Sequence, residues 1–253
     1  MKEKKQQKDL KNTQNACIIT MGRDGIIVIP KGEKMITYES IKKNSAVNAY
    51  IKAADESLKA LGFTEHSSAH VTRAAECAAY ILTTLGYDEK TVELSRIAGY
   101  LHDIGNLVNR EEHSQSGAVM AFRILDKMGM EPEDIATIVT AIGNHDEGNG
   151  VPVNAVSAAL ILADKSDVRR SRVRNSDIST FDIHDRVNYS VESSSLEISE
   201  DKKEIILSLT IDTEISSLMN YFEIFLGRMM LCRRAADKLG TDFRLIINGQ
   251  QFI

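Results

Sequence analysis

The spacing of apolar residues divides the chain into a helical part and a shorter part with alternating positions. From residue 38 to about residue 170, apolar residues recur three or four positions apart, which is typical of helices with one buried face. Gly62, Gly86 and Gly129 suit helix ends, and Pro132 suits a first turn. This segment is therefore predicted to be a compact all-helical unit, with helices over 38–61, 68–85, 88–103, 114–128, 132–142 and 153–166.

The pattern changes after Arg174. Apolar residues alternate with polar ones over 196–198 and 205–211, on either side of the turn 200–203, which predicts a hairpin. Residues 214–239 return to helical spacing, and 243–247 alternate again as a last strand. The fold class is therefore mainly α, with a small C-terminal α+β unit of β-β-α-β order. That unit packs either on the helical domain or on a partner chain, and the second case would give a homo-oligomer.

Residues 1–34 differ in composition from the rest. They hold eight Lys and Arg residues against four acids, which leaves the remaining chain at −9. Residues 1–15 are polar and predict a disordered tail, whereas two apolar runs around Gly-Arg-Asp-Gly at 22–25 favour a hairpin. Whether translation starts at Met1 or Met35 stays open, because Lys-Gly-Glu at 31–33 is what a purine-rich ribosome-binding site would encode.

We therefore divide the chain into an N-terminal extension, flexible or mis-assigned, over 1–34, a helical domain over 35–175 and an α+β unit over 176–253. The length of 253 residues suits one large domain with a small addition. At 43% apolar and 26% charged, the composition is that of a globular protein and excludes wholesale disorder.

Charge and hydropathy exclude several classes of protein. The longest nearly apolar run, 155–163, is about half a membrane span, and 16–21 is too short for a signal-peptide core. We therefore expect a cytoplasmic protein with no membrane partner. Three cysteines without a CxxC pair indicate neither a disulfide framework nor a zinc knuckle. The net charge of −5 argues against binding to a nucleic-acid duplex.

Four histidines and two aspartates near the ends of predicted helices form a candidate metal site. Side chains at helix ends can converge at one rim of a bundle, where metal sites in helical proteins are built. Imidazole and carboxylate ligands suit Mn, Fe, Co, Ni or Zn. The candidate ligands are His70, His102, Asp103, His113, His145 and Asp164.

These residues can be divided between two divalent metals. One would take His70, His102 and Asp164, the second His113 and His145, and the two oxygens of Asp103 would bridge them. Adjacent His102 and Asp103 can both face the site if the last helical turn unwinds at Gly105. Two divalent cations and two carboxylates leave a charge near +2, and each unit-charge contact with a phosphate at about 4 Å is worth on the order of 4 kcal/mol.

This set resembles the HD superfamily of metal-dependent phosphohydrolases, whose signature is a His, a His-Asp pair and a distant Asp. The signature is similar to His70, His102-Asp103 and Asp164, and residues 100–105 carry the strongest match. His113 and His145 are similar to the extra histidines of the dinuclear subset. That subset includes HD-GYP cyclic dinucleotide phosphodiesterases and bacterial HD-type diadenosine tetraphosphate hydrolases. The resemblance covers about residues 45–175 and implies an HD-domain helical bundle.

The chain departs from the HD-GYP pattern in several places. HD-GYP proteins usually carry a lysine three residues after the Asp of the pair, where this chain has Asn106. Asp146 follows His145 where those proteins have paired histidines, and Val151 replaces the tyrosine of GYP. These differences argue against cyclic di-GMP as substrate. Residues 163–169 are similar to the terminal motif of the diadenosine tetraphosphate group.

The resemblance and the charge together predict a metal-dependent phosphohydrolase that cleaves a phosphate ester or anhydride, most plausibly of a nucleotide. Two divalent metals would provide a bridging hydroxide as nucleophile, since metals lower the pKa of water from about 15.7 towards 7. Asp103 would hold both metals, and Lys165 and Arg169 would orient the phosphate. The general acid stays open among the acids at 111, 112, 146 and 147.

Two other functions stay open. A sensor could bind a nucleotide without hydrolysing it. This alternative stays open because Asn106 stands where HD-GYP proteins usually carry a lysine. A vestigial helical domain could also accompany an oligomerising C-terminal unit, although the complete ligand set argues against it. We place His66 in the loop before the helix that Ser67 caps, within reach of substrate or on the surface, and interpret His184 as structural.

Overall fold

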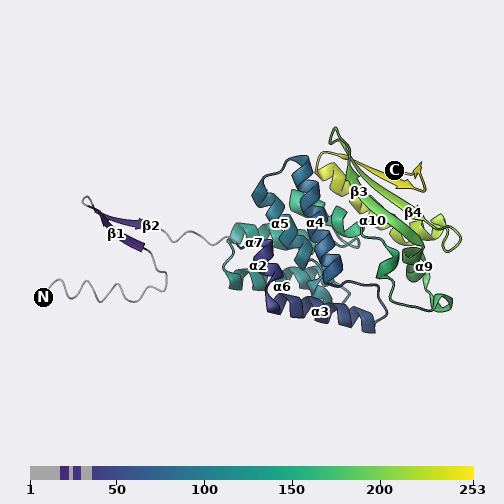
Figure 1. The fold of residues 1–253 in the computed structure, drawn as a ribbon, viewed down its shortest axis with the longest axis horizontal. Helices are drawn as coiled ribbons and strands as arrows, with labels where there is room; N and C mark the ends of the chain where they lie inside the picture. The colour runs from purple at the N-terminus through teal and green to yellow at the C-terminus, as the bar shows by residue number, and fades with distance from the viewer. Residues whose placement is uncertain (1–17, 23–24, 30–35) are drawn as a thin grey trace. The chain divides into compact units, whose positions relative to one another are not determined.

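The computed structural model describes residues 18–22, 25–29 and 36–253, and the chain divides into two compact units, 1–35 and 36–253. In the first unit, β1 (Ile18–Gly22) and β2 (Gly25–Ile29) pair antiparallel, with Ile18 opposite Ile29 (Figure 1). This pairing confirms the predicted hairpin. The predicted tail over 1–15 and the choice of start codon lie outside the described residues.

The second unit is mainly helical, and every predicted helical segment is present (Figure 1). The segment 38–61, predicted as one helix, consists of two. The Asn44 side chain accepts hydrogen bonds from the backbone of Ala46 and Val47 and so starts a new helix. The helices before the sheet are α2 (Tyr38–Lys42), α3 (Ser45–Ala60), α4 (Ser68–Leu85), α5 (Glu89–Leu101), α6 (His113–Met128), α7 (Pro132–Gly143), α8 (Ala155–Lys165) and α9 (Ile183–Ser190), with short 3-10 helices η1 (Ile104–Leu107), η2 (Arg170–Arg172) and η3 (Ile178–Thr180).

Helix α8 lies at the centre of the second unit. Every residue from Val156 to Lys165 is buried, which is expected of a helix surrounded by other elements. Its apolar side chains join two hydrophobic clusters, one within the bundle and one under the C-terminal sheet. Although α8 is this apolar, it has only 11 residues, and no helix in the described part of the chain is long and apolar enough to cross a membrane.

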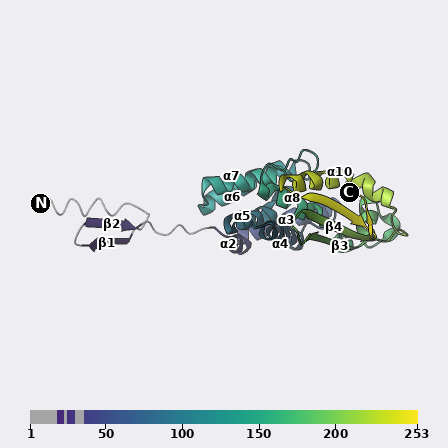
Figure 2. The same ribbon diagram turned by 90° about the horizontal axis from the view of Figure 1, so that it is seen from above.

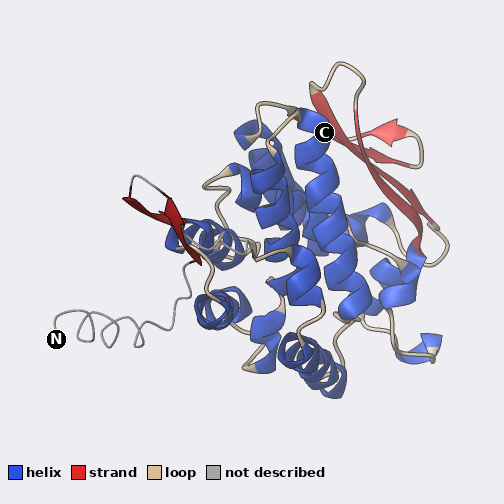
Figure 3. Ribbon diagram, turned by 60° about the vertical axis from the view of Figure 1, so that its left-hand side comes forward, coloured by secondary structure: helices blue, strands red, loops and turns tan. Residues whose placement is uncertain are grey.

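The C-terminal unit is a four-stranded mixed sheet with one long helix. The strands β3 (Val191–Ile198), β4 (Glu204–Ile211), β5 (Asp242–Ile247) and β6 (Gln250–Gln251) lie in the order β3-β4-β5-β6. Strands β4 and β5 are parallel, and α10 (Leu218–Lys238) connects them. Figures 1 and 2 place this sheet at one end of the second unit, with α2 at the other, and Figure 3 shows it along one edge of the helices. The predicted β-β-α-β unit is confirmed, with β6 as an added strand.

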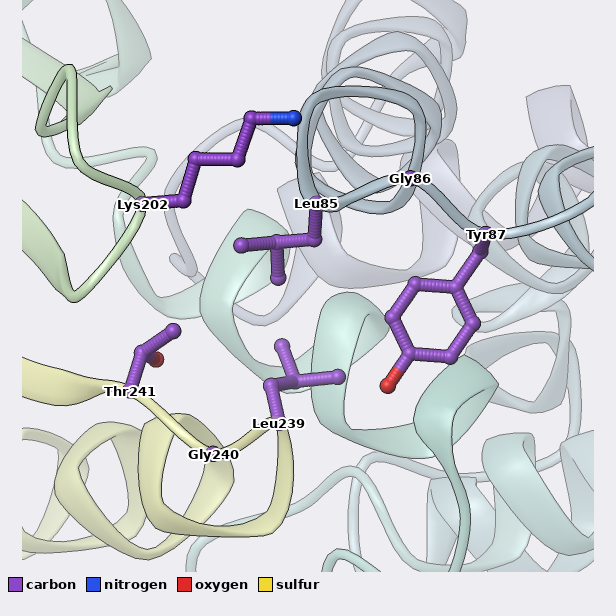
Figure 4. Close-up of a pocket in the computed structure, with 7 residues that line it drawn as sticks. All are labelled: Leu85, Gly86, Tyr87, Lys202, Leu239, Gly240 and Thr241. Atoms are coloured by element: carbon purple, nitrogen blue, oxygen red, sulfur yellow. The ribbon is translucent and has the colours of Figure 1, made fainter.

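The sheet and the helical bundle share a core. Side chains of α4, α8, α10, β4 and β5 form one cluster, in which Phe225 and Met229 of α10 are almost fully buried. The C-terminal unit therefore packs on the helical domain of the same chain. A cavity of about 370 Å³ remains between the end of α4, the β3–β4 turn and the end of α10 (Figure 4).

Two glycines permit close packing around the end of α5. A Cβ atom on Gly99 would lie 2.6 Å from the Cα of Ala75 in α4. A Cβ atom on Gly105 would lie 2.0 Å from the carbonyl oxygen of His113 and 2.4 Å from the nitrogen of Gly117. With any larger residue at position 105, η1 and α6 could not lie as close together as they do. The predicted unwinding at Gly105 is wrong in position. Helix α5 ends earlier, at Leu101, and Gly105 instead permits this contact.

We expect opposite effects on stability from alanine at two helical glycines. Gly99→Ala should destabilise the protein by about 1–3 kcal/mol, because the added methyl group overlaps the backbone of α4. Gly227→Ala in α10 should stabilise it by about 0.5–1 kcal/mol, because nothing lies within 4 Å of the new Cβ and alanine favours helix. Urea unfolding of both variants measures the difference, and equal effects would contradict the close α4–α5 packing.

Candidate metal centre

The structure brings together all six predicted metal ligands, each from near the end of a helix. His70 lies in the first turn of α4, His113 begins α6, and Asp164 lies in the last turn of α8. His102 and Asp103 follow α5 directly, and His145 follows α7. None of the six is more than 9% exposed. Burying so many polar groups together is costly unless they have partners, so the arrangement needs a physical explanation.

One group of ligand atoms surrounds a single position. Oδ2 of Asp103 lies 3.4 Å from Nε2 of His70 and 3.3 Å from Nε2 of His102. Oδ1 of Asp164 lies 3.3 and 3.5 Å from the same two nitrogens. Ligand atoms about 2.1 Å from one ion are separated by about 3 to 3.5 Å, so these separations fit a shared metal ion.

Three of these four atoms lack other partners. Nε2 of His70, Nε2 of His102 and Oδ2 of Asp103 are buried and form no hydrogen bond. Buried polar atoms without partners are rare in folded proteins and call for a ligand or an ion. His70, His102 and Asp164 offer one group of close ligand atoms, and His102, Asp103 and His145 offer another; imidazole and carboxylate groups of this kind are donors for a divalent metal.

A second group lies on the other side of Asp103. Nε2 of His113 is 3.2 Å from Nε2 of His145 and 3.6 Å from Oδ1 of Asp103. The two oxygens of Asp103 therefore face two different sets of histidines, as a bridging carboxylate requires. The side-chain amide of Asn106 donates to Oδ1 of Asp103 at 2.9 Å and so fixes the orientation of the carboxylate.

The second nitrogen of every one of these imidazoles has a hydrogen-bond acceptor. Nδ1 of His102, His113 and His145 each faces the carbonyl oxygen of the residue three positions earlier, at 2.8, 3.0 and 2.6 Å. Nδ1 of His70 faces Oδ2 of Asp167 at 2.7 Å. Because these oxygens can only accept, Nδ1 carries the proton and Nε2 keeps its lone pair in the neutral ring. Such bonds fix the tautomer and the orientation of metal-binding histidines.

The electrostatics of the cluster favour positive charge at its centre. Burial raises the pKa of Asp103, but His102 and the other imidazoles outweigh it, and the pKa is held well below its usual value. For Asp164, burial also raises the pKa, and Lys165 above all holds it well below. Burial lowers the pKa of His145 well below its usual value. Ionised carboxylates and a neutral imidazole are the forms that bind metals.

His102 behaves differently from His145. Burial lowers its pKa, but the charge of Asp103 outweighs burial and raises the pKa to about 10. The position between Asp103 and Asp164 therefore requires a cation. A protonated imidazole or a divalent metal would supply that charge.

The two predicted phosphate-binding residues have different surroundings. Nζ of Lys165 lies 2.8 Å from Oδ2 of Asp164 and 2.7 Å from Oε2 of Glu147, so this lysine directly adjoins the cluster. Arg169 binds Asp167 through Nε at 2.7 Å and lies 3.3 Å from Glu65. It thus holds the carboxylate that orients His70, a contact that the sequence reasoning did not foresee.

A cavity of about 430 Å³ adjoins the cluster. It is lined by Leu61, Gly62, Phe63, Thr64, His66, Arg110, Glu147, Arg172, Asp182, His184, Asp185, Asn188, Phe225 and Arg228. The ring of His66 lies 5.5 Å from that of His70, and Nη1 of Arg110 lies 3.4 Å from Nε2 of His113. The cavity in Figure 4 differs, because Lys202 is the one charged residue among the seven that line it.

Sequence reasoning missed Asp167 and the three arginines of this cavity. Asp167 lies three residues after Asp164, and this spacing was a signal that could have been used. Arg110 and Arg228 come from separate parts of the chain and share no motif, whereas Arg172 belongs to the basic run over 169–174, which is typical of a solvated face. His66 lies before the Ser67 cap, as predicted, and lines the cavity together with His184.

Part of this chain is similar to known proteins. The HD domain family model matches residues 68–186, a span that contains all six clustered residues. The chain is 28% identical over 215 residues to the uncharacterized protein MJ1020 of Methanocaldococcus jannaschii, covering 76% of this chain and 80% of that protein. The crystal structure of a predicted HD superfamily hydrolase from an uncultured Thermotogales bacterium matches with a TM-score of 0.38 and 22% identity, covering 52% of this chain and 73% of that one. The part of this chain that is similar to the HD domain family is therefore residues 68–186.

Proposed function

We propose that this protein is a metal-dependent phosphohydrolase that cleaves a phosphate ester or anhydride, most plausibly of a nucleotide. One observation carries the proposal. Four buried imidazoles, each with Nδ1 bound to an acceptor, direct Nε2 towards the two ionised oxygens of Asp103 and towards Asp164. This arrangement has no use in packing alone, and it would supply the ligands of a two-metal centre.

The donor set fits divalent transition metals. His70, His102 and Asp164 would hold one ion, His113 and His145 the second, and Asp103 would contact both. Nitrogen and oxygen ligands of this kind suit Mn, Fe, Co, Ni or Zn. Bound there, such metals would lower the pKa of a water molecule and neutralise charge on phosphate oxygens.

Residues next to the ligands have separate tasks in this proposal. Asn106 holds the carboxylate of Asp103, which would contact both metals, in one orientation. Lys165 adjoins Asp164 with a buried ammonium group, which would attract a phosphate oxygen at the same edge of the cluster. Arg169 orients His70 through Asp167, and its own charge adds to the attraction for anions.

The surroundings of the acids narrow the choice of general acid. Burial raises the pKa of Glu147, but Lys165 and Arg228 outweigh burial and hold the pKa far below its usual value. Glu147 is thus ionised and has no proton to give. Asp146 is half-buried, with Oδ1 3.9 Å from Nζ of Lys165, and it lies beside His145. The candidates for the proton donor to the leaving group are therefore Glu111, Glu112 and Asp146.

Replacement of the central carboxylate should remove both metal binding and activity. In Asp103→Asn, an uncharged amide stands between two groups of imidazoles, so the metal content of protein loaded with Mn should fall sharply. Turnover of bis(p-nitrophenyl) phosphate should fall by about 10³-fold, since the charge stabilisation that metals supply is worth several kcal/mol. Elemental analysis and the phosphodiesterase assay measure the two effects.

Asp126→Asn is the matched control for this experiment, because Asp126 is exposed on α6. It should keep the metal content and turnover of the unchanged protein. Full metal content and full turnover in Asp103→Asn would refute the proposal. Bound metal and tight nucleotide binding, with no turnover of any member of a nucleotide panel, would instead identify a sensor.

Replacement of His145 should separate the two metal positions. In His145→Ala the second position loses an imidazole while His70, His102 and Asp164 remain, so the metal content should fall from about two ions per chain to about one. His184→Ala is the control, since this exposed histidine belongs to neither group of ligand atoms. Elemental analysis after gel filtration gives the ratio, and an unchanged content in His145→Ala would exclude the dinuclear assignment.

A further inference from the structure

We propose that helix α10 of the C-terminal unit completes an anion-binding subsite beside the metal centre, in which Arg110, Arg172 and Arg228 hold a second phosphate group of the substrate. The substrate class would then be compounds with at least two linked phosphates. The inference rests on the proposed function, because that function places the first phosphate at the metal centre. The subsite itself is the cavity of about 430 Å³ described above.

Arg228 reaches this cavity from α10. Its Nε donates to Oε1 of Glu147 at 3.1 Å, and its guanidinium lies over the ring of Phe225, 4.4 Å from the ring centre. These contacts hold the plane of the guanidinium in one orientation. Among the described residues, neither Nη atom of Arg228 has a hydrogen-bond partner. Two parallel N–H donors therefore remain for a phosphate, which is the geometry that arginine offers such groups.

Arg110 lies between the cavity and the metal centre. Its Nη1 is 3.3 Å from Oδ1 of Asn106 and 3.4 Å from Nε2 of His113, and its guanidinium lies 5.9 Å from the ring centre of Phe63. No carboxylate in the described part of the chain forms an ion pair with it. A second phosphate, linked to a phosphate at the metal centre, would therefore reach the charge of Arg110 before those of the other two arginines.

Arg172 is the most buried of the three. Its Nε donates to the carbonyl oxygen of Glu65 at 2.9 Å and its Nη1 to that of Asp167 at 2.8 Å. These bonds to carbonyl oxygens fix the side chain, and its ion pair with Oδ2 of Asp167 is long, at 3.9 Å, and shared with Arg169. A buried charge of this kind favours an anion in the adjoining cavity.

Three acids also line the cavity, and each has another partner. Glu147 contacts Lys165 at 2.7 Å as well as Arg228. Asp182 is exposed and caps α9 through the backbone of Asp185, and the carboxylate of Asp185 accepts from Asn175. The lining thus holds three arginines and three acids, so its formal charges balance. Arg172 is the most buried of these six residues, so the most buried charge that lines the cavity is positive.

Part of this subsite lies outside the HD domain. The family model ends at residue 186, whereas Arg228 lies in α10, and residues 61–66 of the cavity wall precede the model. The C-terminal unit thus has a part in substrate selection as well as in the shared core. A short path of ion pairs joins it to the metal ligands, from Arg228 through Glu147 and Lys165 to Asp164.

The test compares binding of inorganic pyrophosphate and orthophosphate to the metal-loaded protein by calorimetry, with metal in excess. In Arg228→Gln the Kd of pyrophosphate should rise by about 10-fold or more, since hydrogen bonds to charged groups are worth about 1.5–3 kcal/mol. The Kd of orthophosphate should change less, because the metal centre binds it. Arg228→Lys should give an intermediate value, since it keeps the charge without the paired donors.

Arg233→Gln is the matched control, because Arg233 is exposed on the same helix, and it should bind both ligands like the unchanged protein. Circular dichroism checks folding, and Arg110→Gln provides the same test on a second residue. Equal losses for both ligands, or no loss, would overturn the subsite. The proposed function fails separately, if metal-loaded unchanged protein does not turn over bis(p-nitrophenyl) phosphate.

Discussion

The buried charge of Asp103 and Asp164 is the constraint on which the centre of this protein depends. Two carboxylates in the interior are costly unless positive charge or hydrogen-bond donors surround them. Here His70 and His102 place Nε2 between them, and the raised pKa of His102 shows how strongly that position requires a cation. The protein meets the requirement with a proton or a metal, and the Nδ1 bonds keep the rings in place for either.

The fold holds this centre through close contacts between helix ends. The Nδ1 acceptors of three histidines are carbonyl oxygens of the preceding turn, so each ring is fixed by the way its own segment ends or begins. Gly105 lets η1 lie against the start of α6, which brings His113 to Asp103. Asp164 comes from α8, which is buried along almost its whole length, so the position of this carboxylate is fixed by the packing of the core.

The C-terminal unit is joined to the centre in two ways. Its sheet and α10 share a hydrophobic cluster with α4 and α8, and those two helices carry His70 and Asp164. Its Arg228 also forms an ion pair with Glu147, which contacts Lys165. The shared hydrophobic cluster and the ion pair thus both connect the C-terminal unit to the metal centre. A function confined to oligomerisation would not require the ion pair.

Much of the fold follows from local sequence. Apolar spacing, the caps at Ser67 and Asn154 and glycines such as Gly86 and Gly129 set the helices, because these signals act within a few residues. The break at Asn44 was the exception, since a cap inside a continuous apolar pattern is hard to distinguish from a surface polar residue. The alternating positions after residue 190 likewise determined the hairpin and the last long strand.

The sequence by itself determined which side chains could bind metal, because imidazoles and carboxylates at helix ends have few other uses in such a set. Only the tertiary structure decided that the oxygens of Asp103 face different histidines, that Asp167 holds His70, and that Arg110 and Arg228 share a cavity. These relations join residues from separate helices. Their separations depend on how closely those helices pack, and the packing is fixed by the complete core rather than by any local pattern.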